Sequence, residues 1–228
     1  MGTVPETGNR MTFAVGGGRF TLEAFASVEA RNQMNKNRLE AFSDGVLAII
    51  ITVMVIELHT PAEPTWHALV DVLPTVLSYL LSFVFVGIYW NNHHHMLHLA
   101  GHVNGGILWA NLHLLFWLSL VPFTTRWMGD TGFVEIPVLT YGVNLLLAAI
   151  AYFVLRSAII REQGADGPLA QAVGRDWKGK LSPLLYVLGL VLAGLNPGFG
   201  MAAYALVALI WLIPDRRLEL FVRQQGRS

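Results

Sequence analysis

The chain contains no cysteine and few charged residues. The absence of cysteine excludes a disulfide framework and a thiolate metal site. Charged residues make up only 13% of the 228 residues, about half of the roughly 25% that a soluble domain carries. The hydrophobic share is 54%, and the loops that separate the apolar runs are too short to fold as a large soluble domain. These features indicate a membrane protein.

Several motifs of known channel and enzyme families are also missing. The sequence has no Thr-Val-Gly-Tyr-Gly selectivity filter, no regularly spaced arginines of a voltage sensor and no nucleotide-binding loop. It has no Ser, His and Asp on a common loop that could form a catalytic triad. We therefore expect a protein that is not an enzyme, with no cofactor, no metal centre and no nucleic-acid partner.

Long runs without a formal charge predict the fold. A run of about 20 such residues spans a bilayer as a helix, and three runs fit: Val72–Trp90, Ile107–Thr125 and Ile136–Leu155. A fourth run, Leu181–Ile213, is interrupted by the turn signal Asn196-Pro197-Gly198 and predicts a helical hairpin. The apolar run Val46–Ile56 brings the total to six. The predicted fold class is all-α, a polytopic membrane protein with six transmembrane helices per subunit.

The distribution of Lys and Arg predicts the orientation. Basic residues concentrate in residues 10–38, 161–180 and 216–227, whereas the loops after the first and fifth spans have none. Basic loops favour the cytoplasm, so we expect a multi-pass protein of the cell (plasma) membrane with both termini cytoplasmic. We expect a partly disordered cytoplasmic extension over residues 1–35, the six-helix domain over 36–215 and a basic cytoplasmic tail over 216–228.

The first span carries a carboxylate, Asp44, inside an apolar helix. An ionisable residue in such a helix indicates function and a nearby partner. The alternative is that Asp44, helped by Ser43, merely caps the helix. Residues 38–41 already have a helical pattern, which places Asp44 inside the helix.

Helical periodicity puts Ile49, Val53 and Ile56 on one face of the first span with Thr52 at its edge, and Phe42 and Gly45 lie near that face.

Histidines cluster at the inner end of the second span, at His93, His94, His95, His98 and His102. His94 and His98 have the i, i+4 spacing that can bind a metal, but no acidic residue or cysteine is near in sequence. A second interpretation is a polar helix end at the level of the lipid headgroups. A third is that one histidine faces inward and pairs with Asp44.

The third span carries the polar residues Asn111 and His113 near its inner end. Polar side chains at this depth must be hydrogen-bonded or face water. Pro122, near the outer end of the same span, is expected to kink or end the helix.

These three motifs resemble the prokaryotic members of the transmembrane protein 175 family of potassium channels. The signature Arg-x-x-x-Phe-Ser-Asp is present as Arg38, Phe42, Ser43 and Asp44. Two further patterns, Trp90-x-Asn92-His93-His94 and Asn111 with Pro122-Phe123-Thr124, are also similar to the family. The resemblance covers about residues 36–215.

The resemblance implies a homotetramer in the lipid bilayer whose four first helices line a pore for K⁺ ions. It implies a leak-type, K⁺-preferring channel with no carbonyl filter. The hydrophobic constriction is then formed by rings of side chains from the first helix: Ile49, Val53 and Ile56, with Thr52 as a polar ring. It also implies a structural polar network, in which His94 is the favoured partner of Asp44; the network comprises Arg38, Phe42, Ser43, Asp44, Asn92, His93, His94 and Asn111.

Two other functions remain open at this stage. One is a proton- or metal-coupled membrane transporter that uses Asp44 and the His93–His102 cluster. The other is a structural or assembly protein without flux. A passive channel differs from a coupled transporter because its flux follows the electrochemical gradient alone.

Overall fold

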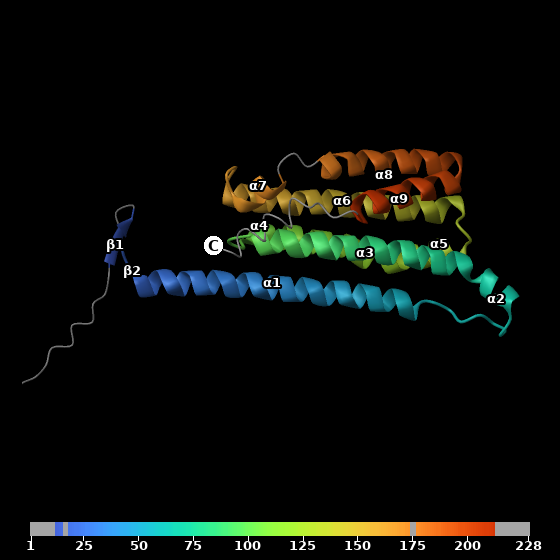
Figure 1. Ribbon diagram of the computed structural model, residues 1–228, viewed down its shortest axis with the longest axis horizontal. Coiled ribbons are helices and arrows are strands. Elements are labelled where there is room, and N and C mark those ends of the chain that lie inside the picture. Colours follow the sequence, from blue (N-terminus) through green and yellow to red (C-terminus); the bar gives the residue numbers. More distant parts are fainter. Residues whose placement is uncertain (1–11, 16–17, 174–176, 213–228) are drawn as a thin grey trace, which may run out of the picture.

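A computed structural model describes residues 12–15, 18–173 and 177–212 of the chain. A short antiparallel hairpin precedes a bundle of long, roughly parallel or antiparallel helices (Figure 1). The described elements are β1 (Thr12–Val15), β2 (Gly18–Thr21), α1 (Leu22–Ile56), α2 (Trp66–Asp71), α3 (Leu73–Leu99), α4 (Gly105–Ser119), α5 (Val121–Asp130), α6 (Glu135–Gln163), α7 (Pro168–Val173), α8 (Trp177–Leu195) and α9 (Pro197–Leu212).

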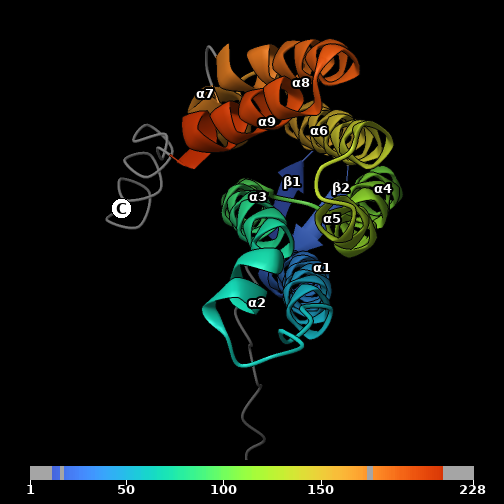
Figure 2. The ribbon, with the colours of Figure 1, turned by 90° about the vertical axis from the view of Figure 1, so that its right-hand side faces the viewer.

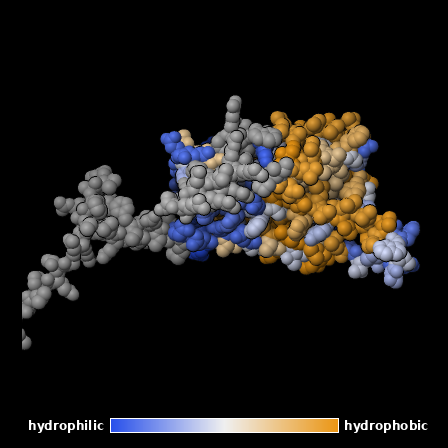
Figure 3. Space-filling view, viewed as in Figure 1, coloured by the Kyte–Doolittle hydropathy of each residue, from blue (hydrophilic) through white to orange (hydrophobic). Residues whose placement is uncertain are grey.

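The bundle has the surface of a membrane protein. Among the described residues, four helical segments are long and apolar enough to cross a bilayer: Asn35–Ile56, Leu73–Leu99, Gly105–Asp130 and Glu135–Gln163. Two shorter apolar helices, α8 and α9, follow them. Figure 3 shows an apolar band on this face, with hydrophilic surface at the α7 end and at the α2 end. The helical prediction is therefore confirmed for the membrane part of the chain.

The break points of the helices follow from local sequence. α8 and α9 form the predicted hairpin, because the Asn196 side chain accepts a bond from the Gly198 N–H at 2.8 Å and turns the chain. The third predicted span is divided into α4 and α5 at Leu120, and Pro122 lies in the first turn of α5. A proline tolerates that position because the first N–H groups of a helix have no partner within the helix. The predicted effect of Pro122 is thus confirmed.

The N-terminal part differs from the expectation of a wholly helical chain. β1 and β2 pair in register from Thr12 with Thr21 to Val15 with Gly18, which sequence reasoning did not predict. α1 is one helix of 35 residues that continues through residue 35 without a break. The expected basic tail over residues 216–228 lies outside the described residues, as do residues 1–11 of the expected extension.

α1 lies at the edge of the bundle, against α3, α4 and α5 (Figure 2). Its buried side chains recur every three or four residues, which is the period of one helix face. The opposite face of α1 is not covered by the other described helices of the subunit. The buried side chains among the described residues of α1 are Lys36, Leu39, Ser43, Leu47, Ile50 and Met54.

Close contact between α3 and α5 depends on Gly129. A Cβ added there would lie 2.7 Å from the backbone Cα of Thr75, a distance that real Cβ atoms essentially never show. Backbone cannot rotate away as a side chain can, so we expect Gly129→Ala to lower the free energy of unfolding by about 1–3 kcal/mol. Gly87→Ala is the matched control, since nothing lies within 4 Å of its added Cβ. Equal thermal melting of the two variants in detergent would contradict this packing.

Candidate functional site

A buried chain of hydrogen bonds joins α1, α3 and α4. The Asn111 amide donates to Ser43 Oγ at 2.9 Å, and its carbonyl oxygen lies 2.7 Å from His93 Nε2. Ser43 Oγ donates in turn to the Leu39 carbonyl at 2.8 Å. All three polar side chains are almost fully buried, with exposed fractions of 0% for Ser43 and Asn111 and 1% for His93. We call Ser43, Asn111 and His93 the polar triad.

The direction of each bond in the polar triad follows from its chemistry. An amide oxygen can only accept, so the proton of the 2.7 Å contact sits on His93 Nε2. His93 Nδ1 is buried and has no hydrogen-bond partner among the described residues, which fits a neutral ring in which Nδ1 carries no proton. Polar groups at membrane depth must be satisfied within the protein. The polar triad therefore satisfies Asn111 with one bond to α1 and one to α3.

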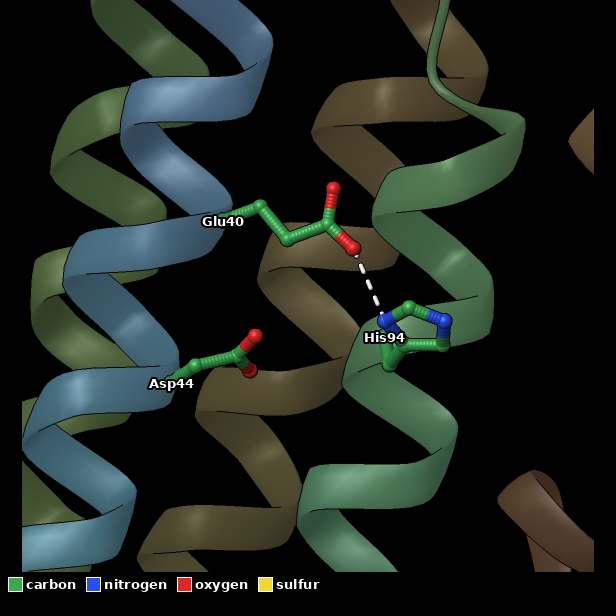
Figure 4. Close-up of side chains that lie close together, drawn as sticks. All are labelled: Glu40, Asp44 and His94. Carbon is green, nitrogen blue, oxygen red and sulfur yellow. Dashed lines mark ion pairs between the residues drawn. The ribbon is translucent and has the colours of Figure 1, made fainter.

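A second polar group lies beside the polar triad, where α1 faces α3. Figure 4 shows Glu40 and Asp44 extending from α1 towards His94 on α3. His94 Nδ1 lies 2.8 Å from Glu40 Oε1 and forms an ion pair when the ring is protonated. Asp44 instead accepts a hydrogen bond from Trp90 Nε1 at 3.1 Å. The favoured pairing of Asp44 with His94 is not the one in this geometry, because His94 pairs with Glu40 and Asp44 is hydrogen-bonded to Trp90.

Glu40, Asp44 and His94 could in principle bind a metal. One ligand atom from each lies within 4.8 Å of the others, and all three residues are partly exposed. Carboxylate and imidazole ligands suit a divalent cation. However, the Glu40–His94 ion pair and the Trp90–Asp44 bond already satisfy the group without an ion. The expectation of no metal centre stays a prediction.

The histidine cluster does not converge on one point. His93 turns into the polar triad, whereas His94 turns towards Glu40. The rings of His94 and His98 stack along α3 with centroids 6.4 Å apart. His102 lies exposed in the loop after α3. His93, His94 and His102 therefore have different surroundings.

Three residues assigned to the polar network lie outside it. Arg38 is exposed at the surface of α1, and Phe42 is 53% exposed on the same side as Ile49. The Asn92 amide donates to the Ile88 carbonyl of its own helix at 2.8 Å, and Asn92 lines a cavity whose described lining contains no residue of α1. For these residues the expectation of a shared network does not match the geometry.

The uncovered face of α1 carries the side chains that periodicity had grouped. Ile49 is 64% exposed, Ile56 is 75% exposed, and Val53 and Thr52 are also exposed. Thr52 Oγ1 donates to the Ala48 carbonyl at 2.8 Å, so its methyl group and oxygen lone pairs remain on the surface. Their neighbour Ile50 points the other way and is 4% exposed. Within one subunit, no other described helix covers this apolar stripe of α1 or the Thr52 hydroxyl that lies in it.

Sequence reasoning missed Glu40 and Lys36 as contacts between α1 and α3. Lys36 is buried and its Nζ donates to the His98 carbonyl at 2.5 Å, at the end of α3. Glu40 binds His94 at the next turn. The signal was present in the spacing, since Lys36, Glu40 and Asp44 recur every four residues and so share one face of a helix.

Comparisons with known proteins identify relatives of this chain. Residues 38–122 match the family model described as endosomal/lysosomal potassium channel TMEM175. A potassium channel of Chryseobacterium sp. (strain P1-3) is 52% identical over 191 residues, covering 84% of this chain and 100% of the relative. A potassium channel of Streptomyces collinus is 29% identical over 192 residues, covering 78% of this chain and 92% of the relative.

A solved structure shares the fold. The crystal structure of a homologue of the lysosomal potassium-selective channel TMEM175 from Chamaesiphon minutus superposes with a TM-score of 0.69 at 23% identity. It covers 79% of this chain and 97% of that chain. The fold is therefore that of a helical membrane channel. With the Chryseobacterium relative matched over its whole length, the chain belongs to the TMEM175 family of ion channels, which is not a family of enzymes.

Proposed function

We propose that this chain forms a homotetrameric, potassium-selective, leak-type cation channel in the plasma membrane. Four copies of α1 line the pore, and both termini of each subunit lie in the cytoplasm. The observation that supports this proposal is the uncovered face of α1, where Ile49, Val53 and Ile56 are all exposed. Two relatives that align along most of this chain are named potassium channels.

The chemistry of the uncovered face suits a hydrophobic constriction. Four Ile49 side chains around one axis would leave a narrow neck that resists wetting. A β-branched side chain is stiff at χ1, so such a neck keeps a defined width. Thr52 and Val53 lie about one turn further along, and Ile56 about two turns further. Ions pass this stretch only by losing water or by widening it, which produces a small leak current.

The polar triad would fix the rotation of α1 about its own axis. Ser43 is buried against the rest of the subunit, whereas the stripe of Ile49 is exposed. Holding Ser43 against Asn111 keeps that stripe turned towards the pore. The network proposed here therefore has a structural part and does not itself carry protons.

The proposal needs six membrane crossings per subunit. α8 has 19 residues and α9 has 16, which correspond to about 28 Å and 24 Å of helix. The hydrocarbon core is about 30 Å thick, so the α8–α9 hairpin nearly spans it. Local thinning of the bilayer can accommodate the remaining mismatch at a modest cost.

Reconstitution into liposomes tests this function. Purified protein in vesicles loaded with K⁺ should pass current under a K⁺ gradient, with a reversal potential that follows K⁺ more closely than Na⁺. Protein-free vesicles are the control. A flux that requires an opposing proton or metal gradient would support the coupled transporter with Asp44 and overturn the channel. No flux of any cation would support an assembly protein.

The substitution Asp44→Asn removes the negative charge of Asp44 but keeps its hydrogen bond. Asparagine keeps an oxygen that accepts from Trp90 Nε1, so we expect thermal stability close to wild type. A carboxylate near the inner end of α1 attracts cations, so the variant should carry less current at low ionic strength. The difference should fade between about 0.01 M and 1 M salt, as the Debye length falls from roughly 30 Å to 3 Å.

The matched control is Asp166→Asn, which removes one carboxylate from the exposed loop between α6 and α7. It should conduct like wild type at both salt concentrations. An Asp44→Asn variant that conducts like wild type at low salt would show that this charge plays no part in collecting cations.

A further inference from the structure

An open cavity lies at the C-terminal end of α1, where this helix meets α5. Its volume is about 370 Å³, within the usual range of roughly 300–1,000 Å³ for ligand pockets. Figure 1 shows α5 and this end of α1 at the same end of the bundle as α2, where Figure 3 shows hydrophilic surface. The cavity therefore lies near the water-facing end of the bundle. Its described lining is Glu57, Phe123, Arg126, Trp127 and Asp130.

Two aromatic rings form part of the wall. Phe123 and Trp127 are four residues apart on α5, so they share a face of the helix. Both side chains are exposed, and their ring centres lie 6.0 Å apart with the planes tilted by 36°. A cation binds an aromatic face from within about 6 Å of the ring centre. One cation in the cavity can therefore lie within this distance of both rings.

The charged side chains of the lining also favour a cation. Glu57 and Asp130 are carboxylates, whereas Arg126 is the one basic residue of the described lining. Arg126 Nε lies 3.3 Å from Asp130 Oδ2, so these two charges pair with each other. Glu57 Oε2 is buried and has no hydrogen-bond partner among the described residues. The charge of Glu57 is therefore weakly screened, which strengthens its attraction for a cation in the cavity.

The chemistry of the lining suits a methylated ammonium ion better than a metal ion. A calcium ion takes about six to eight oxygen ligands, and the described side chains of the lining offer oxygens only from Glu57 and the paired Asp130. A methylated ammonium group has an apolar surface that aromatic rings can cover. Its charge needs no coordinating oxygen and can be balanced by one nearby carboxylate.

We propose that this cavity binds a small organic cation with a trimethylammonium group, which lies against the rings of Phe123 and Trp127 with Glu57 as its counter-charge. A free cation and a choline lipid headgroup present the same group to the protein, and competition experiments separate these two sources. The inference goes beyond the proposed channel. Binding is measured without any ion flux, so failure of one proposal leaves the other standing.

Binding of radiolabelled tetramethylammonium to the purified full chain in detergent tests this site. Wild type should bind the probe saturably in Na⁺ buffer. Glu57→Gln should weaken binding about tenfold, because it removes the unpaired charge. Trp127→Ala should weaken it about two- to fivefold, the usual contribution of one exposed cation–π contact. Saturable binding that is unchanged in Glu57→Gln, or no saturable binding to wild type, would overturn the proposal.

A third variant should change the affinity in the opposite direction. Arg126→Gln removes the positive charge of the lining and frees Asp130 from its ion pair. We expect this variant to bind tetramethylammonium more tightly than wild type does. A gain of affinity is not expected of a misfolded protein, so this variant separates the electrostatic effect from a loss of structure. Weaker binding by Arg126→Gln would contradict the proposed charge balance.

Two matched controls remove the same kinds of side chain at the same end of the molecule. Glu63→Gln removes a carboxylate from the exposed loop before α2, and Trp66→Ala removes an indole that is 84% exposed on α2. Neither residue is part of the described lining, so both variants should bind the probe like wild type. Equal losses in Glu63→Gln and Glu57→Gln would mean that only the general negative charge of this surface attracts the probe.

A second measurement leaves the protein unchanged. Choline and its carbon isostere, in which a quaternary carbon replaces the nitrogen, compete with the labelled probe. Choline should compete about tenfold better, because only choline carries the charge that the rings and Glu57 attract. Equal competition would reveal an apolar groove without charge selectivity and would overturn the site.

Lipid competition identifies the source of the cation. Displacement of the probe by phosphatidylcholine, but not by phosphatidylglycerol, would support the site with a lipid headgroup as its occupant. Displacement by choline without displacement by either lipid would support it with a free cation. Equal displacement by both lipids would show that acyl chains cover the rings, and it would overturn the proposal.

Discussion

Ile49→Asn should raise the single-channel conductance several-fold and weaken the discrimination between K⁺ and Na⁺. Ile49 is 64% exposed on the uncovered face of α1, above the polar triad. An amide in place of each of four isoleucines would let water into a neck that apolar side chains keep dry. The measurement is single-channel current in planar bilayers under bi-ionic K⁺ and Na⁺ conditions, at matched amounts of protein.

Ile50→Asn is the matched control for this substitution. Ile50 is adjacent in sequence but rotated by about 100° and only 4% exposed, so its side chain packs inside the subunit. The variant should lower the yield of folded protein without raising the conductance of the channels that form. If Ile49→Asn and wild type carried equal currents, the constriction would lie elsewhere on the stripe, and Ile56 would be tested next.

Asn111→Leu should lower the stability of the folded subunit by about 1–3 kcal/mol. Leucine has a similar volume but removes both bonds of Asn111, to Ser43 and to His93. Hydrogen bonds between transmembrane helices average roughly 0.6 kcal/mol each and reach about 1.7. The expected loss also includes the buried His93 N–H that is left without an acceptor. Thermal melting followed by size-exclusion chromatography measures the change.

Asn92→Leu provides the comparison for Asn111→Leu. Asn92 is an asparagine of α3 that bonds to the Ile88 carbonyl of its own helix and joins no second helix. We expect its loss to change stability by less than about 0.5 kcal/mol. Similar losses from both variants would mean that the polar triad does not hold α1 to its neighbours.

The sequence was sufficient to predict most of the membrane helices because their signal is local. Uncharged runs marked α3, α6 and the α8–α9 hairpin, and Pro122 marked the break before α5. Periodicity also separated Ile49 from Ile50, of which the structure exposes the first and buries the second. The β1–β2 hairpin was not predicted, since its strands of four residues are too short to show a period.

The pairing of polar side chains between helices could not be predicted. Helical spacing shows that Glu40 and Asp44 share a face of α1, but not which of them lies level with His94 on α3. That level depends on the relative shift of two helices, and a shift by one turn exchanges the partners.

A single introduced cysteine tests the central claim most directly, since the native chain has none and so gives no background. Ile49→Cys and Trp109→Cys compare two highly exposed positions, 64% on α1 and 75% on α4, of which only the first should face the pore. Silver ions enter cation pathways and bind thiols. The account predicts that silver blocks the K⁺ current of Ile49→Cys and leaves Trp109→Cys unaffected; block of Trp109→Cys alone would contradict it.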